Sequence, residues 1–316
     1  MANLYLTHRC KRGCPFCFAR KVLKESGENV NELLSIDDIR LFLDRFGSEV
    51  KVIGLLGGEP FLYPHMRELL ALLDERGVFA KIFTSATDPM PEILSEKYSQ
   101  DVAGKCCFVV NVGTRDTYSD EKFAHLQEFF KHYNEVSSLS FTIFDLNADP
   151  TYLFDLTDEY NFVRNIRAGI ALPILNGGNE YIPLDKYKEA GDYFVHAADM
   201  AAQRHITLSM DCGFVACMFD ATQIGHLQRL GGEINFVCGS AIDIGPRLLA
   251  WNCFPLFQIG RVNTMDAANM RQLKEMLHDS TTQYLGAARG VFAECDNCKM
   301  MERGLCQGGC KSFKSV

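Results

Sequence analysis

Residues 3–17 read NLYLTHRCKRGCPFC, a short apolar run that ends near Thr7 and is followed directly by three cysteines. The run predicts a buried strand, and the cysteines after it are separated by three and then two residues. Three thiolates on one short loop can converge on a single metal centre. A four-iron cluster needs four ligands, so Cys10, Cys14 and Cys17 would leave one iron open. An open coordination position is what a catalytic metal needs.

Basic side chains surround this cysteine triplet. Arg9, Lys11 and Arg12 lie next to the thiols in the sequence, and their positive charge is expected to favour thiolates and a negatively charged cluster. The alternative is a structural zinc site, in which His8 would supply the fourth ligand.

The composition is that of an ordinary soluble protein apart from its cysteines. The 316 residues are 47% apolar and 23% charged, enough to bury a core without disulfides. The net charge of −8 argues against a general nucleic-acid or anionic-membrane surface. The sequence shows no signal segment and no apolar run that would span a bilayer. We therefore expect a cytoplasmic protein with no nucleic-acid and no membrane partner, whose 13 cysteines are metal ligands or redox groups.

Short apolar runs alternate with helical patterns through the first two thirds of the chain, which predicts a parallel sheet with helical crossovers. The predicted strands are Asn3–Thr7, Lys51–Leu56, Phe79–Thr84, Phe108–Val112, Leu139–Phe144, Arg167–Leu172 and Ile206–Met210. The predicted helices are 36–46 with Ser35 as its cap and Gly47 as its stop, Met66–Arg76, Lys122–Tyr133 and Leu184–Arg204. We expect an α/β fold, with a partial (β/α)6 barrel over residues 1–210 and a small cysteine-rich, cluster-binding domain over residues 211–316. The boundary falls near Ser209–Gly213.

Small polar residues follow the predicted strands, at the end where ligands bind in barrels. After the second strand, Gly57 and Gly58 allow a ligand to approach the backbone closely, and Pro60 stiffens the exit. Glu59 can accept a hydrogen bond from a ligand amine, or it can serve as the carboxylate at a helix N-terminus. Further candidate ligand contacts after the third and fourth strands, with ordinary strand-end hydrogen bonding as their alternative, are Thr84, Ser85 and Asn111.

Over roughly the first 210 residues, the chain resembles the radical SAM superfamily. Cys-x3-Cys-x-aromatic-Cys, with Phe16 as the aromatic residue, follows the first strand, and Gly-Gly-Glu-Pro follows the second. The resemblance implies that the triplet binds a [4Fe-4S] cluster whose open iron is chelated by S-adenosylmethionine. It implies that Gly57, Gly58 and Glu59 meet the methionine amino group. The reduced cluster would cleave S-adenosylmethionine to a 5′-deoxyadenosyl radical, which abstracts hydrogen from a substrate carbon.

A second set of cysteines lies after residue 210, and its eight thiols would suffice for two four-iron clusters. They are Cys212, Cys217, Cys238, Cys253, Cys295, Cys298, Cys306 and Cys310. Two glycines precede the last thiol and permit a tight turn around a cluster. The alternative is a zinc ribbon formed by the last four of these cysteines.

This later part resembles a SPASM domain with its twitch hairpin. Cys238-x14-Cys253 matches the hairpin pair. The final run matches except for a longer spacing before Cys306 and a terminal family cysteine that is not found after Cys310. The resemblance implies one auxiliary [4Fe-4S] cluster bound by Cys238, Cys253, Cys310 and an upstream cysteine, and a second bound by Cys295, Cys298 and Cys306. Cys212 or Cys217 would fill the vacancies, or the second cluster would keep an open iron. One or two auxiliary clusters are therefore expected.

Three further residues have competing interpretations. Asp211 ends the last predicted strand at the barrel mouth, where it is either a substrate contact or proton acceptor, or a turn-forming residue. Cys106 and Cys107 enter a buried strand. Because adjacent strand residues point to opposite faces, we expect core thiols rather than metal ligands there.

The SPASM resemblance favours a ribosomal peptide as the substrate, matured by a crosslink or another oxidation. Because the first strand begins at Asn3, we expect no leader-binding domain ahead of the barrel. Expected partners are then a separate leader-peptide-binding protein and a one-electron donor such as flavodoxin or ferredoxin. The alternatives are a radical SAM enzyme acting on a small metabolite or amino acid, a glycyl-radical activase, and a non-catalytic iron–sulfur or zinc module.

Overall fold

The computed structural model describes residues 2–20, 32–95, 99–102, 104–175, 178–239, 241–286 and 289–315. Within these ranges, seven parallel strands form most of one sheet, and each lies beside the strand that follows it in the sequence. They are β1 (Ala2–Tyr5), β2 (Val52–Leu56), β3 (Phe79–Thr84), β4 (Cys106–Asn111), β5 (Ser137–Ile143), β6 (Asn165–Ile170) and β7 (Thr207–Met210). The predicted α/β fold with a parallel sheet is confirmed, in the form of an open, barrel-like ring.

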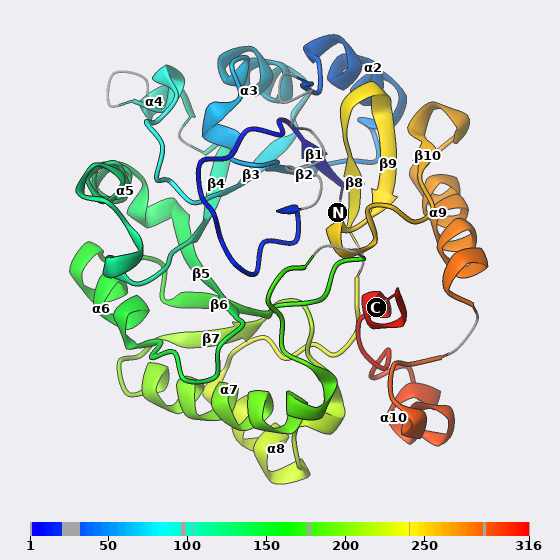
Figure 1. Ribbon diagram of the computed structural model, residues 1–316. Coiled ribbons are helices and arrows are strands. Elements are labelled where there is room, and N and C mark those ends of the chain that lie inside the picture. The colour runs from blue at the N-terminus through cyan, green and yellow to red at the C-terminus, as the bar shows by residue number, and fades with distance from the viewer. Residues whose placement is uncertain are drawn as a thin grey trace.

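Helices cover the outside of this ring of strands (Figure 1). They are α2 (Ile36–Phe46), α3 (Met66–Glu75), α4 (Ser99–Val102), α5 (Asp120–Tyr133), α6 (Thr151–Tyr160), α7 (Tyr187–Ala202) and α8 (Ala221–Leu230). Two further helices, α9 (Met270–Leu285) and α10 (Lys299–Glu302), belong to the C-terminal part of the chain. The cap predicted for α2 is confirmed, because Ser35 Oγ accepts the N–H of Asp38 at 3.0 Å. In the described part of the chain, no helix has the length and apolar character needed to cross a membrane.

Strands from the cysteine-rich part of the chain extend the same sheet. On its other side β1 pairs in parallel with β8 (Ile242–Ile244), and β9 (Leu249–Asn252) and β10 (Val262–Asn263) follow in antiparallel order. The sheet therefore continues past the boundary predicted near Ser209–Gly213. β7 lies within the predicted strand Ile206–Met210, and α8, which follows it, was not among the predicted helices.

Two apolar clusters stabilise the fold. The larger lies between the sheet and its helices, and the smaller contains Tyr5, Ala19, Trp251 and Phe254. Tyr5 and Ala19 lie on either side of the cysteine triplet, whereas Trp251 and Phe254 lie on either side of Cys253. The smaller cluster therefore packs the loop of the triplet against the later part of the chain.

Candidate functional site

The loop that follows β1 carries the cysteine triplet across the mouth of the barrel (Figure 1). Arg12 reaches the end of β4, where Nη1 donates to the carbonyl oxygen of Asn111 at 2.6 Å and Nη2 donates to Tyr118 Oη at 3.0 Å. Phe16 packs against Phe144 just beyond β5, with ring centroids 4.8 Å apart. The loop thus spans the carboxyl ends of the strands, the edge at which barrels bind their ligands.

The two glycines after β2 make room for the triplet loop. The N–H of Gly58 donates to the carbonyl of Thr7 at 2.7 Å, and the N–H of Glu59 donates to that of Arg9 at 2.7 Å. A Cβ on Gly57 would lie 2.8 Å from the Thr7 carbonyl oxygen, and one on Gly58 would collide with the Arg9 carbonyl. The backbone of the cysteine loop thus approaches both glycines, and their contact with a bound ligand stays a prediction.

Glu59 is buried, and its carboxylate binds the end of β3. Oε1 accepts from Thr84 Oγ1 at 2.5 Å and from the Phe61 N–H at 3.2 Å, while Oε2 accepts from the Ser85 N–H at 2.9 Å and from its Oγ at 2.6 Å. Burial raises the pKa of Glu59, and these hydrogen bonds oppose the rise. Glu59, Thr84 and Ser85 thus bind one another. The bond to Phe61 makes Glu59 the cap of the 3-10 turn that Pro60 begins, the alternative considered for it.

Burial raises the pKa of two triplet thiols, to about 12 for Cys10 and about 11 for Cys17. Negative charge on Cys14 raises both further, which places the sulfurs within electrostatic range of one another. The charge of Arg20 lowers the pKa of Cys17 in part, whereas Lys11 pairs with Asp88 at 3.2 Å. The expectation that flanking charge favours thiolates stays a prediction for the metal-bound site. A metal has to displace the protons.

The His8 side chain already interacts with neighbouring side chains. Its Nδ1 lies 3.2 Å from Tyr5 Oη, and its Nε2 lies 4.0 Å from a carboxylate oxygen of Glu32. Burial lowers the pKa of His8, so its ring is neutral at pH 7. The pairing with Tyr5 disfavours the zinc site in which His8 would be the fourth ligand.

Two cations that the sequence analysis did not single out face the interior of the barrel. Lys81 on β3 and Arg167 on β6 both approach the ring of Phe83, at 5.8 and 5.6 Å from its centroid. Arg167 Nη2 also donates to Asp211 Oδ1 at 2.7 Å, so the predicted substrate contact at the end of β7 is an ion pair. Burial and the charge of Arg167 lower the pKa of Lys81. Lys81 and Arg167 are each a basic residue within a largely apolar strand, and this pattern could have identified them from the sequence.

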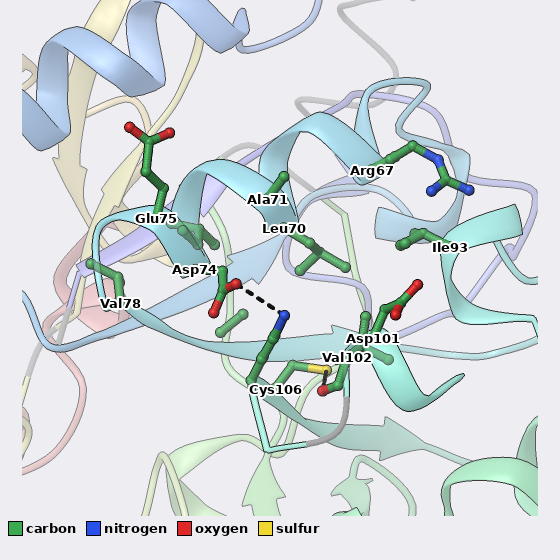
Figure 2. Close-up of a pocket in the computed structure, with 13 residues that line it drawn as sticks. Arg67, Leu70, Ala71, Asp74, Glu75, Val78, Ile93, Asp101, Val102 and Cys106 are labelled. Carbon is green, nitrogen blue, oxygen red and sulfur yellow. Dashed lines mark hydrogen bonds and ion pairs between the residues drawn. The ribbon is translucent and has the colours of Figure 1, made fainter. Parts of the chain in front are cut away.

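Cys106 and Cys107 point to opposite faces of β4, as predicted. Cys106 lines a pocket of about 290 Å³ on the helix-covered face, beside α3 (Figure 2). Asp74 pairs with Lys105 there at 2.9 Å. Cys107 lies on the inner face within electrostatic range of Lys81. Cys106 is therefore a core thiol, whereas the same prediction is wrong for Cys107, which is only partly buried and faces the barrel interior.

The later cysteines separate into two groups by their electrostatic neighbours. The pKa of Cys253 is raised first by burial and then, among the thiols, by negative charge at Cys310, Cys212 and Cys238. We call these four cysteines set A. By this grouping, Cys310 belongs with Cys238 and Cys253, the predicted hairpin pair. It does not belong with the three cysteines that precede it in the sequence, Cys295, Cys298 and Cys306.

The remaining four cysteines form set B. Burial and negative charge at Cys306, Cys295 and Cys298 raise the pKa of Cys217 to about 11. In the described residues, no three His, Cys, Asp or Glu side chains converge closely enough to chelate one ion. A four-iron cluster is larger than one ion, so its ligands stand farther apart. The division into two sets is unlike the zinc ribbon considered for the last four cysteines.

Comparisons with known proteins agree with this geometry. Residues 4–98 match the model of the radical SAM superfamily. The crystal structure of SuiB from Streptococcus suis bound to S-adenosylmethionine has a TM-score of 0.67 at 16% identity, over 98% of this chain and 72% of that one. SuiB bound to its precursor peptide SuiA gives 0.66 at 15% identity, over 98% and 71%. No curated protein sequence matches this chain. The chain thus carries a radical SAM domain and shares the fold of SuiB.

Proposed function

We propose that this chain, with a radical SAM domain over residues 4–98, is an oxidoreductase that cleaves S-adenosylmethionine at a [4Fe-4S] cluster and oxidatively matures a ribosomal peptide. The observation that supports the proposal is that the loop bearing Cys10, Cys14 and Cys17 follows β1 and is hydrogen-bonded to the loop after β2 and to the end of β4. When bound, the cluster and S-adenosylmethionine supply a 5′-deoxyadenosyl radical that abstracts hydrogen from a substrate carbon.

The protein's own part at the mouth is to hold the triplet loop in place. Arg12 fixes the loop to β4, and backbone hydrogen bonds join it to the loop after β2. Because the carboxylate of Glu59 is already bound by Thr84 and Ser85, we expect a ligand amine to meet the backbone of residues 57–59 rather than this side chain. Asn111 contributes its carbonyl to the anchoring of Arg12. Such anchoring fixes the distance between cofactor and substrate.

The inner face of the barrel suits a substrate with both charged and polar groups. Arg167 and Asp211 are partly exposed there and carry opposite charges, and Lys81 lies within electrostatic range of both. The charged groups of a peptide, or the ammonium and carboxylate of an amino acid, can replace the Arg167–Asp211 ion pair. Arg167 and Asp211 would then each form an ion pair with the substrate. These residues therefore orient the substrate, and Asp211 is the candidate proton acceptor.

A peptide is the favoured substrate because the fold is shared with SuiB, which was crystallised with the precursor peptide SuiA. A small metabolite or amino acid is the second candidate, because the Arg167–Asp211 pair also fits a zwitterion. Two partners belong to the proposal: a one-electron donor such as flavodoxin or ferredoxin, and a separate leader-peptide-binding protein. The auxiliary clusters would take up the electron that an oxidative maturation releases.

The cleavage assay tests the core of the proposal. Protein reconstituted anaerobically with iron and sulfide is expected to form 5′-deoxyadenosine from S-adenosylmethionine when dithionite is added. Cys14→Ala is expected to reduce this product to background, because one of three ligands is lost. Cys106→Ala is the matched control, since it removes a thiol from the opposite face of the sheet. No product from the reconstituted parent protein, or full product from Cys14→Ala, would refute the proposal.

The substrate class requires a separate measurement. The protein is incubated with short peptides encoded next to its gene and, in parallel, with free amino acids. The masses of the products are then measured by mass spectrometry. Loss of a pair of hydrogens from a peptide supports oxidative maturation. A change only in an amino acid or small metabolite favours the second candidate.

A further inference from the structure

Two cations meet at one aromatic ring on the inner face of the barrel. Lys81 lies on β3 and Arg167 lies on β6, and the strands β4 and β5 separate them in the sheet. Even so, Lys81 Nζ lies 5.8 Å and Arg167 Cζ lies 5.6 Å from the ring centroid of Phe83. The two long side chains therefore converge on one place from different parts of the wall.

The alternation of each strand turns both cations away from the helices. Lys81 and Arg167 are partly exposed. The residues on either side of each are buried: Ala80, Ile82, Ile166 and Ala168. Because successive strand residues point to opposite faces, both cations project into the barrel.

Phe83, the ring that they share, lies just beneath the mouth. It directly precedes Thr84, which ends β3 and binds Glu59. Gly54 of β2 leaves room for the ring, since a Cβ there would lie 3.3 Å from Phe83 Cε2. The position of the ring is thus set by two strands, and the cations reach the level at which a substrate would enter.

The positive charge of Lys81 is not neutralised by contact with another side chain. Within the described parts of the chain, Lys81 forms no ion pair and no hydrogen bond, and its one contact of this kind is with Phe83. Asp211 and Glu233 lie within electrostatic range, but Asp211 pairs with Arg167. Lysine is rarely buried without a partner. An anion that enters from outside would stabilise this charge.

Arg167 can bind such an anion together with Lys81. Its Nη2 donates to Asp211 Oδ1 at 2.7 Å, and donors on its other nitrogens remain available. A guanidinium binds carboxylates well because its planar donors match both oxygens. The negative charge of Asp211 repels a doubly charged anion more strongly than a singly charged one, which favours a carboxylate over a phosphate.

We propose that Lys81 and Arg167 form a subsite beside Phe83 that binds a carboxylate of the substrate. The inference deepens the proposed function and rests on it, because it takes the inner face of the barrel as the substrate site. The carboxylate belongs to an acidic side chain of a peptide, or it is the terminal group of a peptide or amino acid. In either case it fixes the substrate just beneath the strand ends, below the cysteine loop.

Titration calorimetry on the cluster-loaded protein tests the subsite with three small probes. N-acetyl-aspartic acid α-amide carries only a side-chain carboxylate, N-acetylglycine carries only a terminal one, and N-acetyl-asparagine amide is the neutral control. One of the two acids is expected to bind at least about tenfold more tightly than the neutral amide, and the acid that binds identifies the source of the carboxylate.

The variants assign this binding to Lys81. Lys81→Gln is expected to weaken binding of the acid about tenfold, whereas Lys81→Arg retains the charge and the binding. The matched control is Lys105→Gln, because Lys105 pairs with Asp74 on the helix-covered face. Equal binding of acids and neutral amide, unchanged binding in Lys81→Gln, or equally tight binding of inorganic phosphate would overturn the carboxylate subsite.

Cys107 reports the same charge without a probe that must bind tightly. It pairs in register with Lys81 and is partly exposed on the same face. Iodoacetate is negatively charged and iodoacetamide is neutral, and both alkylate the same thiolate. The ratio of their rates at Cys107, measured by peptide mass spectrometry, is expected to fall at least about threefold in Lys81→Gln. An unchanged ratio, or no labelling of Cys107 by either reagent, would refute an accessible cation at this place.

The cleavage assay on the parent protein decides the proposed function separately. A parent that binds an acid probe through Lys81 but forms no 5′-deoxyadenosine would refute the proposed function and leave the anion subsite in place. A parent that forms 5′-deoxyadenosine, but whose reagent ratio at Cys107 does not depend on Lys81, would refute only the subsite.

Discussion

The cysteine triplet and the eight later cysteines are held by two different kinds of scaffold. The triplet loop bridges the ends of regular parallel strands and is anchored by Arg12 and by backbone hydrogen bonds. The later cysteines lie on short turns and irregular segments, such as η8 (Ala216–Met218) and η12 (Ala293–Asn297). Regular strands form the barrel mouth, whereas most backbone hydrogen bonds of residues 291–313 close short turns, such as that from the Cys298 N–H to the carbonyl of Cys295. We therefore expect a bound metal to stabilise the later region more than the barrel mouth.

The two regions also differ in the number of thiols that each site gathers. Cys10 lies within electrostatic range of two other cysteines, whereas Cys253 and Cys217 each lie within range of three. Three ligands leave a four-iron cluster one open position, and four ligands close it. Under the proposed function, the triplet would therefore be the site of chemistry, and the later cysteines would serve electron transfer.

Removal of the iron is expected to have the largest effect, and mainly on the later region. Amides of residues 289–315 are expected to exchange about 100-fold faster after chelation, whereas those of β2 to β4 change by less than about threefold. Hydrogen exchange followed by mass spectrometry, on loaded and chelated protein, measures both regions at once. Equal acceleration in the two regions would break the comparison, because the chain would then unfold as one unit.

Adding a single methyl group at the barrel mouth is expected to cause loss of the cluster at the cysteine triplet and to leave the other clusters in place. In Gly58→Ala the new Cβ collides with the Arg9 carbonyl and lies 2.9 Å from the Cβ of Cys10, so the triplet loop must move. We expect loss of about four of about 12 iron atoms and at least about a 100-fold fall in cleavage of S-adenosylmethionine.

The matched control lies in the loop itself. A Cβ on Gly13 has no neighbour within 4 Å, so Gly13→Ala is expected to keep the parent iron content and cleavage. Iron analysis and quantification of 5′-deoxyadenosine distinguish the two variants. If Gly58→Ala lost iron from all three sites, the mouth and the later region would depend on each other.

Local patterns predicted most of the fold. The cap at Ser35 and the strand Phe79–Thr84 lie where the sequence places them, because caps and apolar runs act over a few residues. The pairing of β8 with β1 was not predicted, since it joins segments some 240 residues apart and Ile242–Ile244 is a short run without a distinctive period. Short strands acquire their partner from tertiary packing rather than from propensity.

The sequence predicted which cysteines form the candidate site, but it did not predict the contacts that position them. The spacing of the triplet located the metal site, but the burial of Glu59 beneath Thr84 and Ser85 depends on how two strand ends meet. Spacing along the chain does not specify distance in space when a helix and a strand lie between the ligands.

The most local predicted effect concerns one carboxyl group at the junction of the two regions. Asp243 is fully buried on β8, where Oδ1 accepts from Asn3 Nδ2 of β1 at 2.7 Å, and burial raises its pKa to about 7. A carboxyl whose pKa is higher in the folded chain contributes stability that is complete below about pH 4 and is lost as pH rises through about 7. Asp243→Asn should therefore be more stable than the parent by up to about 4 kcal/mol near pH 8, and the difference should shrink toward pH 4.

Denaturant unfolding at several pH values measures this difference, with the exposed Asp266→Asn as the control that should leave the pH profile unchanged. The amide introduced by Asp243→Asn retains an oxygen that can accept from Asn3, so the variant tests the charge rather than the hydrogen bond. Because β8 joins the later region to the first strand of the barrel, slower exchange is expected in both β1 and β8. Slower exchange in β8 alone would mean that the later region unfolds separately even where it shares a sheet with the barrel.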